Sequence, residues 1–89
     1  MKIKEGFVLR QVCGEYVIVG EGLNAINFGR LLSLNETAAW IWQEAQKLGD
    51  FTIEQLAERL CEEYEVDADT AKQDVTTIVG QWQKENVVE

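Results

Sequence analysis

The stretch that decides the fold is FGRLLSLNETAAWIWQEA, residues 28–45. Its first half alternates as a strand does, which places one set of side chains on the same face: Phe28, Arg30, Leu32 and Leu34. Asn35 then predicts a helix start, because its side-chain oxygen can accept a hydrogen bond from a backbone N–H two or three residues later. The chain is therefore expected to change from strands to helices at this point.

The residues before this stretch are expected to form an antiparallel hairpin and the start of a third strand. Residues 7–12 and 16–19 are rich in β-branched and aromatic side chains. Gly14 lies between them, where a two-residue hairpin turn needs a positive φ angle. Glycines at 20 and 22 indicate a loop, and the third strand is expected over residues 25–34.

Three helices are expected after the strands. The first runs from Asn35 to about Leu48 and stops at Gly49, a residue suited to the left-handed conformation. The second begins at a capping box, in which Thr52 and Gln55 each bond to the other's backbone N–H.

The third helix is expected to begin at Asp67 and to close at Asn86. Spacing of three and four residues predicts that its buried stripe consists of Ala71, Val75, Ile78 and Trp82. Lys72 and Val79 are expected on one flank of that stripe.

Three strands followed by three helices predict an α+β fold of the winged-helix kind, with a three-stranded antiparallel N-terminal sheet followed by a three-helix bundle. At 89 residues, the chain is expected to be a single domain over 1–89. No apolar run approaches the roughly 18 residues of a membrane span, and the first residues lack the apolar core of a signal peptide. A cytoplasmic protein without membrane contact is expected.

The residue types present argue against catalysis. There is no histidine, which excludes Ser-His, Cys-His and His-metal arrangements. Cys13 and Cys61 lack metal-ligand spacing, so two buried or half-buried thiols are favoured over a zinc site or a disulfide. The carboxylates fall at helix positions expected to face solvent, where nothing raises their pKa toward that of a general acid. We therefore expect a non-enzyme with no catalytic residue, metal or cofactor.

The charge of the chain argues against nucleic-acid binding. Sixteen acidic residues against eight basic ones give a net charge of −8, which repels a phosphate backbone. A DNA-reading third helix would offer two glutamines and the lysines Lys72 and Lys84 among acids, whereas such helices normally lie in a basic surround. DNA binding is kept as the lesser alternative.

A groove between the third strand and the third helix is the favoured binding surface. If that strand lies at an edge, its free N–H and C=O groups can pair with an incoming strand. Val75 and Val79, with Leu31 or Leu32, would line apolar pockets beside it. Val79 is a strong contact candidate, because its expected direction leaves it partly outside the core. For Leu32, Leu34, Val75 and Ile78, a purely structural place in the core is favoured over a contact role.

Two residues of the strand itself are further candidates. Gly29 has no side chain to block a partner backbone, although it can instead mark a bulge. Arg30 is expected to lie partly outside the core.

Several motifs together resemble the PqqD-like family. They are LNETAAWIW from Leu34, TIEQLA from Thr52, and the closing run from Tyr64 to Trp82. The resemblance covers nearly the whole chain. It implies a RiPP recognition element, a chaperone that holds the leader segment of a ribosomally synthesised precursor peptide as an added strand and presents it to a modifying enzyme, often of the radical S-adenosylmethionine (SAM) type. Founding members act in pyrroloquinoline quinone (PQQ) biosynthesis.

Carried over by position, the resemblance implies a peptide-binding set on the third strand and third helix: Asn27, Phe28, Gly29, Arg30, Leu31, Leu32, Lys72, Val75, Thr76 and Val79. A general protein-interaction module of the same fold is the alternative. Monomer and homodimer both stay open, because an unpaired edge strand can form a dimer.

Overall fold

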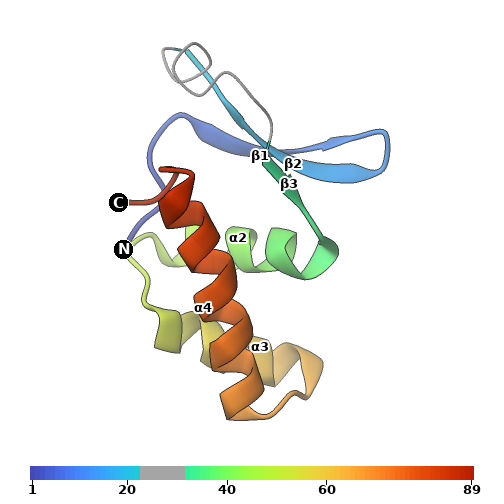
Figure 1. The fold of residues 1–89 in the computed structure, drawn as a ribbon, viewed down its shortest axis with the longest axis vertical. Coiled ribbons are helices and arrows are strands. Elements are labelled where there is room, and N and C mark those ends of the chain that lie inside the picture. Colours follow the sequence, from blue (N-terminus) through green and yellow to red (C-terminus); the bar gives the residue numbers. More distant parts are fainter. Residues whose placement is uncertain (23–31) are drawn as a thin grey trace.

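The structure, a computed structural model, describes residues 1–22 and 32–89 (Figure 1). Strands β1 (Phe7–Val12), β2 (Glu15–Gly20) and β3 (Leu32–Leu34) form an antiparallel sheet in the order β1-β2-β3. Helices α2 (Glu36–Leu48), α3 (Ile53–Tyr64) and α4 (Ala68–Lys84) follow. This confirms the predicted order of a three-stranded sheet and three helices, while the expected start of the third strand lies outside the described residues.

A two-residue turn joins β1 to β2. Cys13 and Gly14 have φ angles of 52° and 81°, and positive φ at both positions gives the turn whose twist matches that of the flanking strands. The predicted hairpin is thus confirmed. Both cysteines are free; Cys61 is half-buried as expected, but the expected burial of Cys13 is wrong, because the turn holds it out in solvent.

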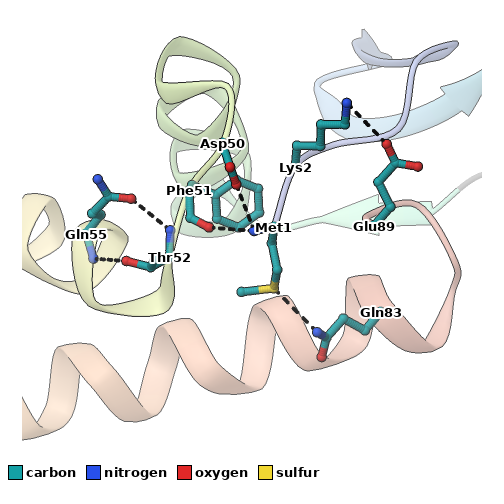
Figure 2. Close-up of polar contacts among 8 residues, drawn as sticks. All are labelled: Met1, Lys2, Asp50, Phe51, Thr52, Gln55, Gln83 and Glu89. Carbon is teal, nitrogen blue, oxygen red and sulfur yellow. Dashed lines mark hydrogen bonds and ion pairs between the residues drawn. The ribbon is translucent and has the colours of Figure 1, made fainter.

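The predicted helix caps of α2 and α3 are confirmed. The Ala38 N–H donates to Asn35 Oδ1 at 2.8 Å, and Gly49 closes α2 with φ 77°. In the capping box of α3, the Gln55 N–H donates to Thr52 Oγ1 at 3.1 Å, and the Thr52 N–H donates to Gln55 Oε1 at 2.9 Å (Figure 2). These bonds satisfy N–H groups that a helix start otherwise leaves without partners.

Helix α4 also begins and ends where the sequence predicts. The Thr70 N–H donates to Asp67 Oδ1 at 2.8 Å. This backbone bond, followed by one from the Thr70 hydroxyl, lowers the pKa of Asp67 because both stabilise its charged form. Past the helix end, Asn86 takes the left-handed conformation with φ 67°.

The core lies between the sheet and all three helices, and its largest fully buried side chains are Trp42, Trp82, Phe51, Ile18 and Ile41. Helix α4 crosses in front of the other two helices in Figure 1. Its buried stripe is Ala71, Val75, Val79 and Trp82.

The predicted stripe of α4 is therefore wrong at one position. Val79 is fully buried and Ile78 only half-buried. Val79 follows Val75 by four residues and precedes Trp82 by three, which places all three on one helix face.

The segment before β1 pairs with the segment after α4. Ile3 and Val88 form an antiparallel bridge, and Lys2 and Glu89 exchange backbone hydrogen bonds of 2.9 and 2.8 Å. The side chains of Lys2 and Glu89 also point toward each other, while the Met1 ammonium contacts Asp50 Oδ1 at 3.0 Å (Figure 2). This pairing brings the apolar residues near the C-terminus into the core, since Val88 is only 6% exposed.

Within the described ranges, none of the helices combines the length and the apolar character needed to cross a lipid bilayer.

Candidate functional site

Strand β3 lies at one edge of the described sheet, and β1 lies at the other. Strand β2 lies at the centre and pairs with β1 on one side and with β3 on the other. Among residues 1–22 and 32–89, no strand pairs with the outer side of β3. The prediction that the third strand is an edge strand therefore holds for the part that the structure describes.

Hydrogen bonding between β1 and β2 determines which backbone groups of β2 face β3. The Glu21 N–H donates to the Gly6 carbonyl at 2.7 Å, just beyond the pair Phe7–Gly20. In an antiparallel ladder, this bond makes Phe7–Gly20 a pair without direct hydrogen bonds. Because the pattern alternates, Val17 directs its N–H and C=O toward β1, and its neighbours in β2 direct theirs toward β3.

The same alternation continues into β3. Tyr16 and Ile18, which direct their polar groups toward β3, lie opposite Leu34 and Leu32. Ser33 lies opposite Val17 in a pair without direct hydrogen bonds. The N–H and C=O of Ser33 consequently point away from β2, toward the open edge.

The side chains of β3 alternate as predicted. Leu32 and Leu34 are 8% and 9% exposed and belong to the core, whereas Ser33 is exposed. Leu32, a predicted contact, therefore directs its backbone groups to β2 and its side chain into the core. The outward-facing residue is Ser33, which the sequence places on the opposite face without assigning it to the site.

On α4, the structure separates the predicted contact residues into two kinds. Lys72 and Thr76 are exposed, and the Thr76 hydroxyl donates to the Lys72 carbonyl at 2.6 Å. Val75 and Val79 are both 0% exposed. The expectation that Val79 lies partly outside the core is wrong, because its helix position is that of a core residue.

The remaining predicted residues on the third strand lie outside the described residues. They are Asn27, Phe28, Gly29, Arg30 and Leu31.

Two surface hollows adjoin these elements. One, of about 400 Å³, lies where β3 meets α2, and the residues that line it include Tyr16, Ser33 and Glu36. The other, of about 850 Å³, lies along the C-terminal half of α4, and its lining includes Thr77, Gln81 and Lys84. The three-and-four spacing of these polar residues predicts the exposed side of α4, but it does not predict a hollow there.

One carboxylate departs from the expectation that all face solvent. Glu44 on α2 is 8% exposed, and it accepts hydrogen bonds of 2.8 Å from Lys47 Nζ and from Arg59 Nη1. The Lys47 hydrogen bond is the main cause of the lowered pKa of Glu44; the Arg59 bond adds to it, and burial opposes it. A carboxylate held ionised in this way is not a general acid. No cluster that could hold a metal ion occurs in the described part of the chain.

The comparison with protein families identifies the chain. The family model for coenzyme PQQ synthesis protein D (PqqD) matches residues 15–88. The chain belongs to the PqqD family. Comparison with curated protein sequences finds no match.

Solved structures similar to this PqqD-family chain extend over nearly its whole length. TbiB1 in complex with the TbiA(β) leader peptide has a TM-score of 0.77 and 20% identity, covering 100% of this chain and 95% of that one. Lasso peptide synthetase B1 complexed with its leader peptide has a TM-score of 0.72 and 25% identity, covering 98% and 93%.

A third similar structure is the PqqD truncation of Methylobacterium extorquens PqqCD, which is a functional, stand-alone RiPP recognition element. Its TM-score is 0.75 at 19% identity, and the match covers 99% of this chain and 86% of that one. These likenesses support the fold predicted for the chain, an antiparallel sheet followed by three helices.

Proposed function

We propose that residues 1–89 of this PqqD-family protein form a single non-catalytic recognition domain. This domain binds the leader segment of a ribosomally synthesised precursor peptide. In this proposal the leader adds a strand to the open edge of β3 and is presented to a modifying enzyme. The observation that carries the proposal is the outward N–H and C=O of Ser33, at an edge to which no described strand pairs. Two similar proteins were solved with leader peptides bound.

Backbone pairing alone does not provide enough affinity. A net contribution of about 0.5–1.5 kcal/mol for each ladder bond falls well short of the roughly 8 kcal/mol that a micromolar complex needs, because within the described part of β3 only the N–H and C=O of Ser33 point outward. Side-chain contacts must supply the remainder. The exposed predicted residues Lys72 and Thr76 and the hollow along α4 are the proposed sources.

The proposed partner enzyme is of the radical SAM type, as the family resemblance implies. The recognition element would raise the local concentration of the peptide at that enzyme, which is an effect of linked binding events.

Ser33→Pro tests the proposed strand addition. Proline removes the outward N–H while leaving the bonds of Leu32 and Leu34 to β2 in place, and edge strands tolerate proline. Short peptides encoded beside the gene would be fluorescently labelled and titrated. We expect a bound peptide to lose at least about tenfold in affinity, equal to 1.4 kcal/mol.

Ser33→Ala is the matched control, since it also removes the hydroxyl but keeps the backbone N–H. It should bind within about twofold of the wild type, because the proposed contacts come from the main chain. Thermal unfolding of both variants would establish that the sheet is intact. Equal binding by a folded Ser33→Pro variant would contradict strand addition at β3.

A general protein-interaction module of the same fold is the second candidate. DNA binding is the lesser alternative, and α4 is the helix that would enter the groove. Its exposed lysines, Lys72 and Lys84, alternate with exposed acids in a chain of net charge −8. Titration with a generic duplex at low salt separates DNA binding from leader-peptide binding. Saturable binding that weakens steeply with added salt would favour DNA, and its absence would support the peptide proposal.

A further inference from the structure

A cleft of about 420 Å³ lies between α2 and α3, and its lining residues belong to neither β3 nor α4. Trp40 and Leu48 of α2 form one wall, and Glu58, Glu62 and Glu63 of α3 lie on the other. The volume is within the range of sites that hold small ligands or single side chains. The peptide proposal uses none of these residues.

The aromatic wall of this cleft is held in place by a second ring. Trp40 and Tyr64 pack edge to face, with ring centroids 5.4 Å apart and an interplanar angle of 88°. Trp40 is half-buried and Tyr64 is 43% exposed. The Trp40 indole lines the cleft, and Trp is the aromatic side chain that binds cations most strongly through its ring face.

The charges in the cleft do not balance. The one cation of its lining, Arg59, is bonded to Glu44 at 2.8 Å. Within the part of the chain that the structure describes, Glu58, Glu62 and Glu63 form no ion pair. Three carboxylates therefore surround the mouth of the cleft without an opposing charge.

We infer that this cleft docks an arginine-bearing segment of a partner protein. A guanidinium can lie flat on the Trp40 ring while its N–H groups bond two carboxylates, a combination that a lysine ammonium cannot match. A second copy of this chain is disfavoured as the occupant, because two molecules of charge −8 repel each other. Nucleic acid is disfavoured by the sign of the same charge. The inference goes beyond the peptide proposal, and each can fail without the other.

The test is NMR titration of the whole protein with the peptide acetyl-Ala-Arg-Ala-Ala-Ala-Arg-Ala-amide. The three indole N–H signals distinguish the cleft from the core of the protein. Trp40 is half-buried and lines the cleft, whereas Trp42 and Trp82 are fully buried. Salt at about 0.1 M limits unspecific attraction to roughly 10 Å. We expect the Trp40 indole and the amides of α3 to shift, with the other two indoles unchanged.

Two comparisons decide the result. The same peptide with citrulline in place of arginine keeps the shape but loses the charge, and it should cause no shift. The double variant Glu58→Gln/Glu62→Gln should weaken binding about fivefold or more, whereas Glu15→Gln/Glu36→Gln, with the same loss of exposed charge elsewhere, should stay within about twofold.

Any of four outcomes would overturn the inference. The first three are shifts that spread over α4 without the Trp40 indole, equal shifts with the citrulline peptide, and equal weakening by the two double variants. A lysine peptide that binds as tightly as the arginine peptide would also overturn it, because the proposed stacking and paired bonding require a guanidinium.

Discussion

Trp42 of α2 and Trp82 of α4 pack edge to face at the centre of the protein, with ring centroids 5.0 Å apart and an interplanar angle of 81°. Both are 0% exposed. Neither indole N–H has a hydrogen-bond partner among the described residues. The two rings therefore join α2 to α4 through packing rather than through polar contacts, in a geometry that aromatic pairs prefer.

Trp82→Ala should lower the free energy of unfolding by about 3–5 kcal/mol, because it removes a large buried side chain and leaves a cavity. Urea denaturation followed by circular dichroism measures this loss. Trp40→Ala is the comparison, since that ring is only half-buried, and its cost should be at most about half as large. Equal costs for the two variants would show that the central pair is not the main packing contact.

Glu44 should make stability depend on pH in the acid range. Its folded-state pKa is lowered from the ordinary value of 4.5, so its ion pairs contribute stability that is complete above that value and lost as the pH falls through the folded pKa. Glu44→Gln should cost about 1 kcal/mol at pH 7. The difference from the wild type should shrink below pH 4.5.

Unfolding curves at several pH values measure this effect, with Glu58→Gln as the control because Glu58 is exposed. A difference between Glu44→Gln and the wild type that stays constant down to pH 3 would contradict the assignment of the ion pairs.

Thr52→Ala should destabilise the protein by about 1 kcal/mol, because it removes the side-chain acceptor of the α3 capping box. Thr77→Ala is the same chemical change in the middle of α4, where the hydroxyl only donates back to the Gln73 carbonyl at 3.0 Å. Alanine is the better helix former there, so this variant should be neutral or slightly more stable. Thermal unfolding of the two variants side by side checks the opposite signs.

Gly80→Ala should raise the free energy of unfolding by about 0.5–1 kcal/mol. Gly80 lies inside α4, and a Cβ built there meets nothing within 4 Å. Gly49→Ala should instead destabilise, because Gly49 ends α2 with a φ of 77° that other residues rarely adopt. A loss of stability in Gly80→Ala would contradict the prediction, and a steric clash of the added Cβ could not explain it.

Sequence reasoning succeeded where the deciding contacts are local. The caps at Asn35, Thr52 and Asp67 involve residues only three positions apart, so residue type and spacing sufficed. The positive φ of Gly14 was likewise predictable from the turn length. For the same reason the change from sheet to helices could be placed at Leu34 and Asn35.

Two of the errors, at Val79 and at Glu44, concern residues whose neighbours in space are distant in the sequence. Ile78 belongs to the predicted stripe of α4 and Val79 to its flank, and which of them is buried depends on the elements packed at each side. Glu44 is buried and accepts a hydrogen bond from Arg59 of another helix, a contact that no spacing within α2 reveals.

The sequence holds part of the information that sets the direction of the Ser33 backbone groups. A two-residue turn fixes the register of β1 on β2, and the alternation of hydrogen-bonded and non-hydrogen-bonded pairs then continues across β2 to β3. What the sequence did not provide was the pairing of Ser33 with Val17, which decides that its N–H and C=O point outward.

The bridge between Ile3 and Val88 joins residues 85 positions apart (88 − 3). On the ribosome, the first of these emerges long before the second has been made, so the nascent chain has to hold its hairpin and helices together without this closure. Long-range pairing of this kind is acquired late, because the entropic cost of closing a large loop comes before the contact repays it. We therefore expect the pairing of Ile3 with Val88 to form late in folding, together with the burial of Val87 and Val88 in the core.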